Sequence, residues 1–162
     1  MIAKIFQSLG MDIGYLIGGI SPDFSFSAKI GSDEIFVIEA DEYDSAFFDK
    51  RSKFIHYSPN ILLINNIEFD HADIFNDLDE IKKQFHHLLK IIPSSGKIVL
   101  FNHDKNALDV INKGCWADII EINGDKSKAS FDLSSSTIKF DGNSVNINAV
   151  SYTHLRAHET AD

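Results

Sequence analysis

Two clusters of acidic residues each follow directly on a short apolar run. The run Glu34–Ile38 leads into Glu39, Asp41, Glu42 and Asp44, and the run Ile61–Ile64 leads into Glu68, Asp70, His71 and Asp73. So many neighbouring carboxylates require cations or basic partners. A hard cation such as Mg²⁺ takes oxygen ligands and commonly relies on one or two protein carboxylates beside waters and substrate phosphates. We therefore predict Glu39 and His71 as metal ligands and catalytic residues, a carboxylate and an imidazole at two strand ends.

Each candidate also has an ordinary explanation. Glu39 could be a solvated acid in a loop, and an isolated His71 could be a hydrogen-bonded surface histidine. The basic residues Lys50, Arg51 and Lys53 could form a salt-bridged surface loop or contact an anionic substrate.

The elements that must position these residues follow from hydrophobic patterns. Short runs rich in Ile, Val and Phe predict buried parallel strands at 34–38, 61–64, 96–101 and 118–122. Apolar spacings of three and four predict a helix over 78–92, with Asn76 or Asp77 as its N-cap, and a second helix spans 104–113. This alternation predicts an α/β fold, a mostly parallel sheet flanked by helices. Because ligands bind outside the carboxyl ends of such strands, we expect both acidic clusters on one rim of one sheet.

A third strand end carries Asn102-His103-Asp104. These residues could reach a ligand on the same rim or cap the following helix, and capping is favoured.

The remaining chain gives weaker signals. The apolar residues from Ile2 to Leu9 have helical spacing, and Gly10 would end this helix. Residues 14–20 and 24–29 are strand candidates. Residues 43–53 mix charged and aromatic side chains without a clear period. After Gly124, short alternating runs at 128–133, 137–140 and 144–148 predict a small antiparallel meander at the edge of the sheet. We expect one domain over residues 1–149.

Both ends of the sequence have unusual features. A helix that starts at residue 1 without a cap or a preceding strand predicts that upstream sequence has been lost. Val150–Thr160 has neither period and looks like a translated sequencing-library adaptor, so we expect a non-native tail over 150–162, the alternative being a genuine disordered tail. His154 and His158 are discounted as metal ligands for this reason.

Composition excludes several classes of function. A net charge of −9 argues against a nucleic-acid-binding surface. The sequence contains no run of about 18 apolar residues, so we predict no membrane span. The single Cys115 and the lack of a secretory signal agree with a cytoplasmic protein. The sequence contains no G-x-x-x-x-G-K-[ST] loop for nucleotide phosphates.

Three segments resemble the Mur ligases. They are Glu39–Phe54 (EADEYDSAFFDKRSKF), Asn65–Phe75 (NNIEFDHADIF) and Gln84–Leu88 (QFHHL), and the likeness runs from residue 1 to about Asn148. The first segment resembles the members whose amine substrate is the tripeptide L-Ala-γ-D-Glu-meso-diaminopimelate. The member that adds L-alanine differs after EADE and remains an alternative.

The resemblance implies most of the central ATPase domain of a three-domain cytoplasmic enzyme of peptidoglycan recycling. The phosphate-binding loop would precede Met1, and the missing N- and C-terminal domains of the same chain would be its partners. ATP would phosphorylate the carboxylate of UDP-N-acetylmuramate, and the tripeptide amine would attack the acyl phosphate. Glu39 and His71 would bind Mg²⁺ between the γ-phosphate and that carboxylate. We expect the 162 residues alone to be inactive.

Further roles are assigned within this framework. We predict Asp41, Tyr43, Arg51 and Asn66 as substrate-binding residues and Asn102 and Asp104 as ATP-binding residues. Some relatives carry a carbamylated lysine, which cannot be matched securely to Lys82, Lys83 or His86. Two other classes stay open: a metal-dependent phosphohydrolase in which Glu39 and His71 form a complete site, and a non-catalytic interaction domain with a solvated acidic rim.

Overall fold

The computed structural model describes residues 1–125, 127–132 and 137–146. The chain divides into two compact units, Met1–Glu42 and Tyr43–Asp162. The predicted boundary at residue 149 and the predicted tail lie outside the described residues and stay predictions. Among the helices within those ranges, none is both long and apolar enough to cross a lipid bilayer.

The first unit contains one helix and a three-stranded sheet. Its elements are α1 (Ile2–Ser8), β1 (Gly14–Leu16), β2 (Ala28–Lys29) and β3 (Phe36–Ile38). The strand order is β2-β1-β3, with β1 parallel to β3 and antiparallel to β2. Ala3, Ile13 and Tyr15 form its small buried core. Gly10 follows α1 with a φ of 82°, which explains why glycine stands where the helix ends.

The second unit is built on a six-stranded sheet in the order β11-β10-β9-β8-β7-β6. Its strands are β6 (Ile61–Ile64), β7 (Lys97–Phe101), β8 (Asp118–Ile122), β9 (Ala129–Asp132), β10 (Thr137–Phe140) and β11 (Asn143–Asn146). The strands from β6 to β9 are parallel, and β9, β10 and β11 pair antiparallel. The predicted parallel sheet with an antiparallel edge meander is confirmed.

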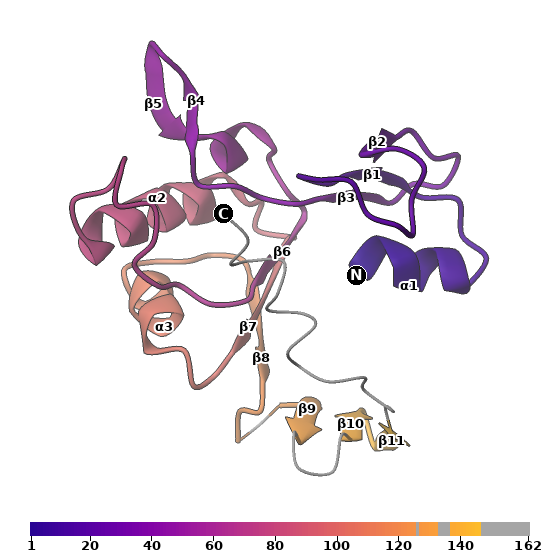
Figure 1. The fold of residues 1–162 in the computed structure, drawn as a ribbon. Helices are drawn as coiled ribbons and strands as arrows, with labels where there is room; N and C mark the ends of the chain where they lie inside the picture. The colour runs from indigo at the N-terminus through magenta and orange to yellow at the C-terminus, as the bar shows by residue number, and fades with distance from the viewer. Residues whose placement is uncertain (126, 133–136, 147–162) are drawn as a thin grey trace. The chain divides into compact units, whose positions relative to one another are not determined.

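Two helices, α2 (Leu78–Ile91) and α3 (Lys105–Asn112), lie together beside the parallel strands (Figure 1). The Asp77 side chain caps α2 by accepting from the Glu80 backbone N–H at 2.9 Å, as predicted. The apolar helix faces and alternate residues of β6 and β7 form one core, which includes Leu62, Ile64, Ile81, Leu88, Leu89, Ile98, Leu100 and Val110. The other face of β6 carries Ile61 and Leu63, which are 66% and 45% exposed.

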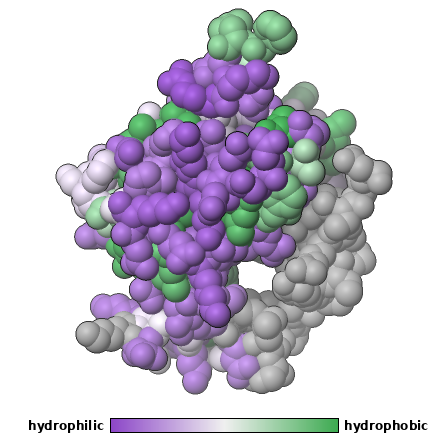
Figure 2. Space-filling model, turned by 90° about the vertical axis from the view of Figure 1, so that its left-hand side faces the viewer, coloured by the Kyte–Doolittle hydropathy of each residue, from purple (hydrophilic) through white to green (hydrophobic). Residues whose placement is uncertain are grey.

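In the second unit, a hairpin and a short helix precede β6. The hairpin consists of β4 (Asp44–Ala46) and β5 (Asp49–Ser52), and a 3-10 helix follows over Lys53–His56. The sequence did not predict this hairpin, because charged and aromatic residues alternate there without a clear period. Phe47 and Phe48 form its turn and are 93% and 91% exposed. Figure 2 accordingly shows an apolar tip above a largely polar surface.

The prediction that both acidic clusters follow strands of a single sheet is wrong for the hydrogen-bonded sheets described. β3 pairs with β1 in the first unit, whereas β6 pairs with β7 in the second. An apolar run indicates a buried strand but does not name the strand beside it, because pairing is decided by long-range packing.

Candidate functional site

Glu39 follows β3 and has a fixed carboxylate. Its backbone N–H donates to the Leu16 carbonyl at 2.9 Å, and its Oε2 accepts from the Gly18 backbone N–H at 2.7 Å. Among the residues that the structure describes, none donates to Oε1. The carboxylate is therefore oriented by one oxygen and offers the other to a ligand.

His71 lies in a tight turn after β6. Its carbonyl accepts from the backbone N–H groups of Ile74 and Phe75 at 2.9 and 3.0 Å, and its own N–H donates to Asp70 Oδ1 at 2.7 Å. Its φ of 55° is uncommon for a residue with a side chain and costs of order 1–3 kcal/mol when the surroundings enforce it. Such strain is concentrated at functional sites.

The aromatic ring of Tyr43 packs against the His71 imidazole. The Tyr43 and His71 rings pack with centroids 4.3 Å apart and planes tilted by 58°. Lys53 Nζ lies 5.9 Å from the Tyr43 ring centroid, and the Lys53 backbone N–H donates to the Tyr43 carbonyl at 2.9 Å. Tyr43, predicted as a substrate-binding residue, thus contacts the predicted catalytic histidine.

The donors of Glu39 and His71 suit a divalent cation. One positioned carboxylate oxygen and one imidazole fit Mg²⁺ only when waters and phosphate oxygens complete its shell. Within the described ranges, no group of three or more His, Cys, Asp or Glu is arranged to hold a metal ion. Glu39 belongs to the first unit and His71 to the second, and their sharing of one ion stays a prediction.

Arg51 is held by a neighbouring carboxylate. Its Nε and Nη2 donate to Asp49 Oδ1 and Oδ2 at 2.9 and 2.7 Å, and His56 Nε2 lies 3.1 Å from Asp49 Oδ2. The Arg51 guanidinium holds the pKa of the Asp49 carboxyl well below its usual range, and the pKa of Arg51 is raised in turn. The structure thus contains the salt-bridged loop of the ordinary explanation, and an anionic substrate would compete with Asp49 for this guanidinium.

Asp104 has a structural role at the start of α3. Its Oδ1 accepts from the N–H groups of Asn106 and Ala107 at 2.9 and 3.1 Å, and its Oδ2 accepts from the Ile67 N–H at 2.8 Å. The favoured capping interpretation is confirmed, and both oxygens are occupied. The predicted contact of Asp104 with ATP remains untested.

The other predicted residues lie in loops or segments that flank strands. Asn66 Nδ2 donates to Glu68 Oε1 at 2.8 Å, and Asn102 is half-buried, with its backbone N–H bonded to the Ile122 carbonyl at 3.1 Å. Asp41 is half-buried in the segment after β3. Their substrate and cofactor roles stay predictions.

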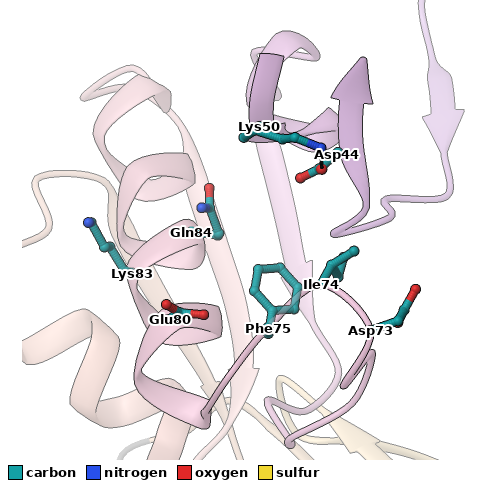
Figure 3. A pocket seen from close by; sticks show the side chains of 8 residues that line it. All are labelled: Asp44, Lys50, Asp73, Ile74, Phe75, Glu80, Lys83 and Gln84. Carbon is teal, nitrogen blue, oxygen red and sulfur yellow. Dashed lines mark hydrogen bonds and ion pairs between the residues drawn. The ribbon is translucent and has the colours of Figure 1, made fainter. Parts of the chain in front are cut away.

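Sequence reasoning missed a groove in the second unit. It has a volume of about 380 Å³, and residues of the β4–β5 hairpin, the turn after His71 and α2 line it (Figure 3): Asp44, Lys50, Asp73, Ile74, Phe75, Glu80, Lys83 and Gln84. The signal was the spacing of Glu80, Lys83 and Gln84, which places them on one side of a helix. Their partners came from a hairpin that the sequence did not reveal.

The neighbouring lysines of α2 have different environments. Lys82 is 9% exposed, and its Nζ pairs with Asp109 Oδ2 of α3 at 2.9 Å. Lys83 is exposed and lines the groove. Adjacent residues on a helix point in directions about 100° apart, so the two side chains serve different surfaces.

The sequence pattern of the Mur ligase middle domain matches residues 21–160, and the chain belongs to the Mur ligase family. It is 52% identical over 118 residues to the UDP-N-acetylmuramate–L-alanyl-γ-D-glutamyl-meso-2,6-diaminoheptandioate ligase of Escherichia coli. It is 50% identical over 117 residues to the ligase of the same name from Haemophilus influenzae. These matches cover 73% and 72% of this chain and 26% of each relative. A UDP-N-acetylmuramate–L-alanine ligase of Clostridium botulinum is 32% identical over 113 residues, which are 70% of this chain and 23% of that ligase.

Solved structures of Mur ligases have the same fold as this chain. The chain superposes with a TM-score of 0.80 and 36% identity on the UDP-N-acetylmuramate:L-alanyl-γ-D-glutamyl-meso-diaminopimelate ligase from Neisseria meningitides, covering 94% of this chain and 52% of that one. A murein peptide ligase from Psychrobacter arcticus gives a TM-score of 0.74 at 35% identity, covering 95% of this chain and 38% of that one. The predicted family is confirmed, and the chain spans about a quarter of the length of the curated relatives it matches.

Proposed function

We propose that this chain forms the middle domain of an ATP-dependent ligase that joins UDP-N-acetylmuramate to L-Ala-γ-D-Glu-meso-diaminopimelate in peptidoglycan recycling. The observation that carries the proposal is the difference in identity, 52% to a ligase named for the tripeptide against 32% to a ligase named for L-alanine. Because ATP and UDP-sugars are cytoplasmic metabolites, we place the enzyme in the cytoplasm.

The reaction forms an amide in two steps. The carboxylate of UDP-N-acetylmuramate attacks the γ-phosphorus of ATP, which gives an acyl phosphate and ADP. The peptide amine then attacks the acyl carbon, phosphate leaves, and the amine loses a proton. Positioning and charge stabilisation supply most of the catalysis in phosphoryl transfer.

Glu39 and His71 would hold Mg²⁺, which neutralises charge on the phosphoryl oxygens when bound. The Gly18 N–H holds Glu39 Oε2 and leaves Oε1 for the ion. Packing against Tyr43 and the turn from His71 to Phe75 orient the imidazole before the substrates arrive. The two side chains are thereby ordered when the protein folds, so the reaction does not have to supply the free energy of ordering them.

The test uses a full-length ligase in which this chain replaces the matched segment of the Escherichia coli relative. Amide formation from ATP and UDP-N-acetylmuramate is measured by chromatography with either the tripeptide or L-alanine as the amine. We expect product with the tripeptide and at least tenfold less with L-alanine. Preference for L-alanine, or ADP release without amide from either amine, would overturn the proposal.

Variants of the same chimera test the site residues. Glu39→Gln and His71→Ala should each lower kcat by roughly a hundredfold or more, the scale of losing one preorganised charge-stabilising group. Glu34→Gln is the matched control, because Glu34 is an exposed acid shortly before β3, and its kcat should stay within about twofold, as for ordinary surface substitutions.

A further inference from the structure

We propose that Asp104 and Asn106, at the start of α3, are positioning residues that hold the backbone leading to His71. The proposal rests on the proposed function, because it gives these two side chains a role in ligation through the predicted metal ligand. It also goes beyond the capping of α3, which uses only one of the two carboxylate oxygens of Asp104. The other oxygen and the Asn106 amide bind Ile67, a residue outside the helix.

Ile67 is held on both sides of its backbone. Its N–H donates to Asp104 Oδ2 at 2.8 Å, and its carbonyl accepts from Asn106 Nδ2 at 2.7 Å. The two partners lie 37 and 39 residues further along the chain, so these bonds are tertiary contacts and not parts of a local turn. The Ile67 side chain is 1% exposed. Burial fixes where this residue lies, and the two bonds fix the orientation of both of its peptide units.

The far end of the same segment is held by α2. Phe75 is 7% exposed, and the residue after it, Asn76, is bound by the Glu80 carboxylate in the first turn of α2. This carboxylate accepts from the Asn76 backbone N–H at 2.8 Å and from its side-chain amide at 3.2 Å. The segment from Ile67 to Asn76 is therefore anchored at each end by the start of a helix, and His71 lies between the two anchors.

The backbone of His71 explains why such anchors matter. Its φ of 55° is a conformation that a residue with a side chain keeps only where the surrounding structure enforces it. The hydrogen bonds of His71 with Asp70, Ile74 and Phe75 set the local shape of the turn, whereas the bonds to Ile67 tie the turn to α3. Loss of the Asn106 amide would therefore displace the imidazole, and a displacement of about 1 Å can cost roughly a hundredfold in rate.

The experiment compares the kcat and KM of the chimeric ligase with those of its Asn106→Ala and Asn106→Asp variants, at a temperature where circular dichroism shows each to be folded. Both variants lack the donor to the Ile67 carbonyl. Asn106→Asp keeps the size of the side chain and places an acid in the first turn of α3, which stabilises a helix. We expect kcat to fall roughly tenfold to a hundredfold in both variants, with the KM values for the tripeptide and UDP-N-acetylmuramate within about twofold of the parent. The control Asn112→Ala changes an exposed asparagine at the other end of α3 and should leave kcat within about twofold.

A double-mutant cycle with His71→Ala separates positioning from general damage. If Asn106 acts through the imidazole, its loss has no further effect once the imidazole is gone, so the double variant should keep the kcat of His71→Ala within about twofold. Damage unrelated to His71 would instead lower kcat by the same factor in both backgrounds. That result, or a kcat equal to the parent's in both Asn106 variants, would overturn the proposal and leave the proposed function intact. Failure of the parent chimera to use the tripeptide would refute the function itself.

Discussion

Asp104 provides a quantitative test of how the second unit is held together. Its carboxylate caps α3 through Asn106 and Ala107 and accepts from the N–H of Ile67, a residue that is 1% exposed. The Asn106 side chain donates to the Ile67 carbonyl at 2.7 Å. Both sides of Ile67 are thus bound to the start of α3, only four residues before His71.

The substitution Asp104→Ala removes two separable contributions. Loss of an N-cap costs about 0.5–2 kcal/mol, and leaving the buried Ile67 N–H without an acceptor costs about 1–3 kcal/mol. We expect the free energy of unfolding to fall by about 2–4 kcal/mol in total, since neighbouring terms do not add fully. Asp104→Asn keeps one acceptor oxygen and should lose about half as much, because it satisfies either the cap or Ile67.

Urea denaturation followed by circular dichroism measures these differences, and amide exchange at Ile67 reports the local contact. The exposed Asp118 supplies the control, and Asp118→Ala should stay within about 0.5 kcal/mol of the parent. If Asp104→Ala were as stable as this control, with Ile67 exchange unchanged, the proposed connection between α3 and the turn at His71 would be refuted.

Two further predictions concern packing and pH. Gly31→Ala should severely destabilise the first unit, because an added Cβ would overlap backbone atoms of residues 12–14. Gly19→Ala should not, because nothing lies within 4 Å of the Cβ added there. Thermal melts that fail to separate the two variants would contradict this packing. Burial, together with the charges of Lys90 and Lys113, lowers the pKa of His86 from its ordinary value of 6.5. The unfolded chain therefore takes up this proton first, and stability should fall as the pH drops below about 6.5. His86→Gln should flatten that slope in urea titrations between pH 7 and 5.5, and an unchanged slope would exclude His86 as its source.

Local signals in the sequence were sufficient for most elements of the second unit. β6 and β8 have the predicted bounds, and α2 differs by one residue from the predicted helix, because each combines a strong apolar period with a clear capping or turn residue. The β4–β5 hairpin was missed because its turn is made by Phe47 and Phe48, which give no glycine or asparagine signal. The expectation that the strands before the two acidic clusters share one sheet was not met, since β3 and β6 belong to different hydrogen-bonded sheets and strand neighbours depend on the whole chain.

The candidate site was predictable in part for similar reasons. Acidic residues after two apolar runs identified Glu39 and His71 as candidates, and their local contacts with Gly18 and Tyr43 appeared only in three dimensions. The role of Asp104 as a cap followed from its position before a helix. The groove could not be predicted, since Asp73 and Lys83 are brought to one surface by tertiary packing.

The central claim, that Glu39 and His71 bind one divalent ion, is tested most directly by anomalous diffraction from crystals of the chimeric ligase with Mn²⁺ and a non-hydrolysable ATP analogue. We predict an anomalous peak at coordination distance from both Glu39 Oε1 and an imidazole nitrogen of His71, and no such peak in Glu39→Gln crystals. A metal bound by the nucleotide and other residues, with Glu39 and His71 apart from it, would contradict the claim.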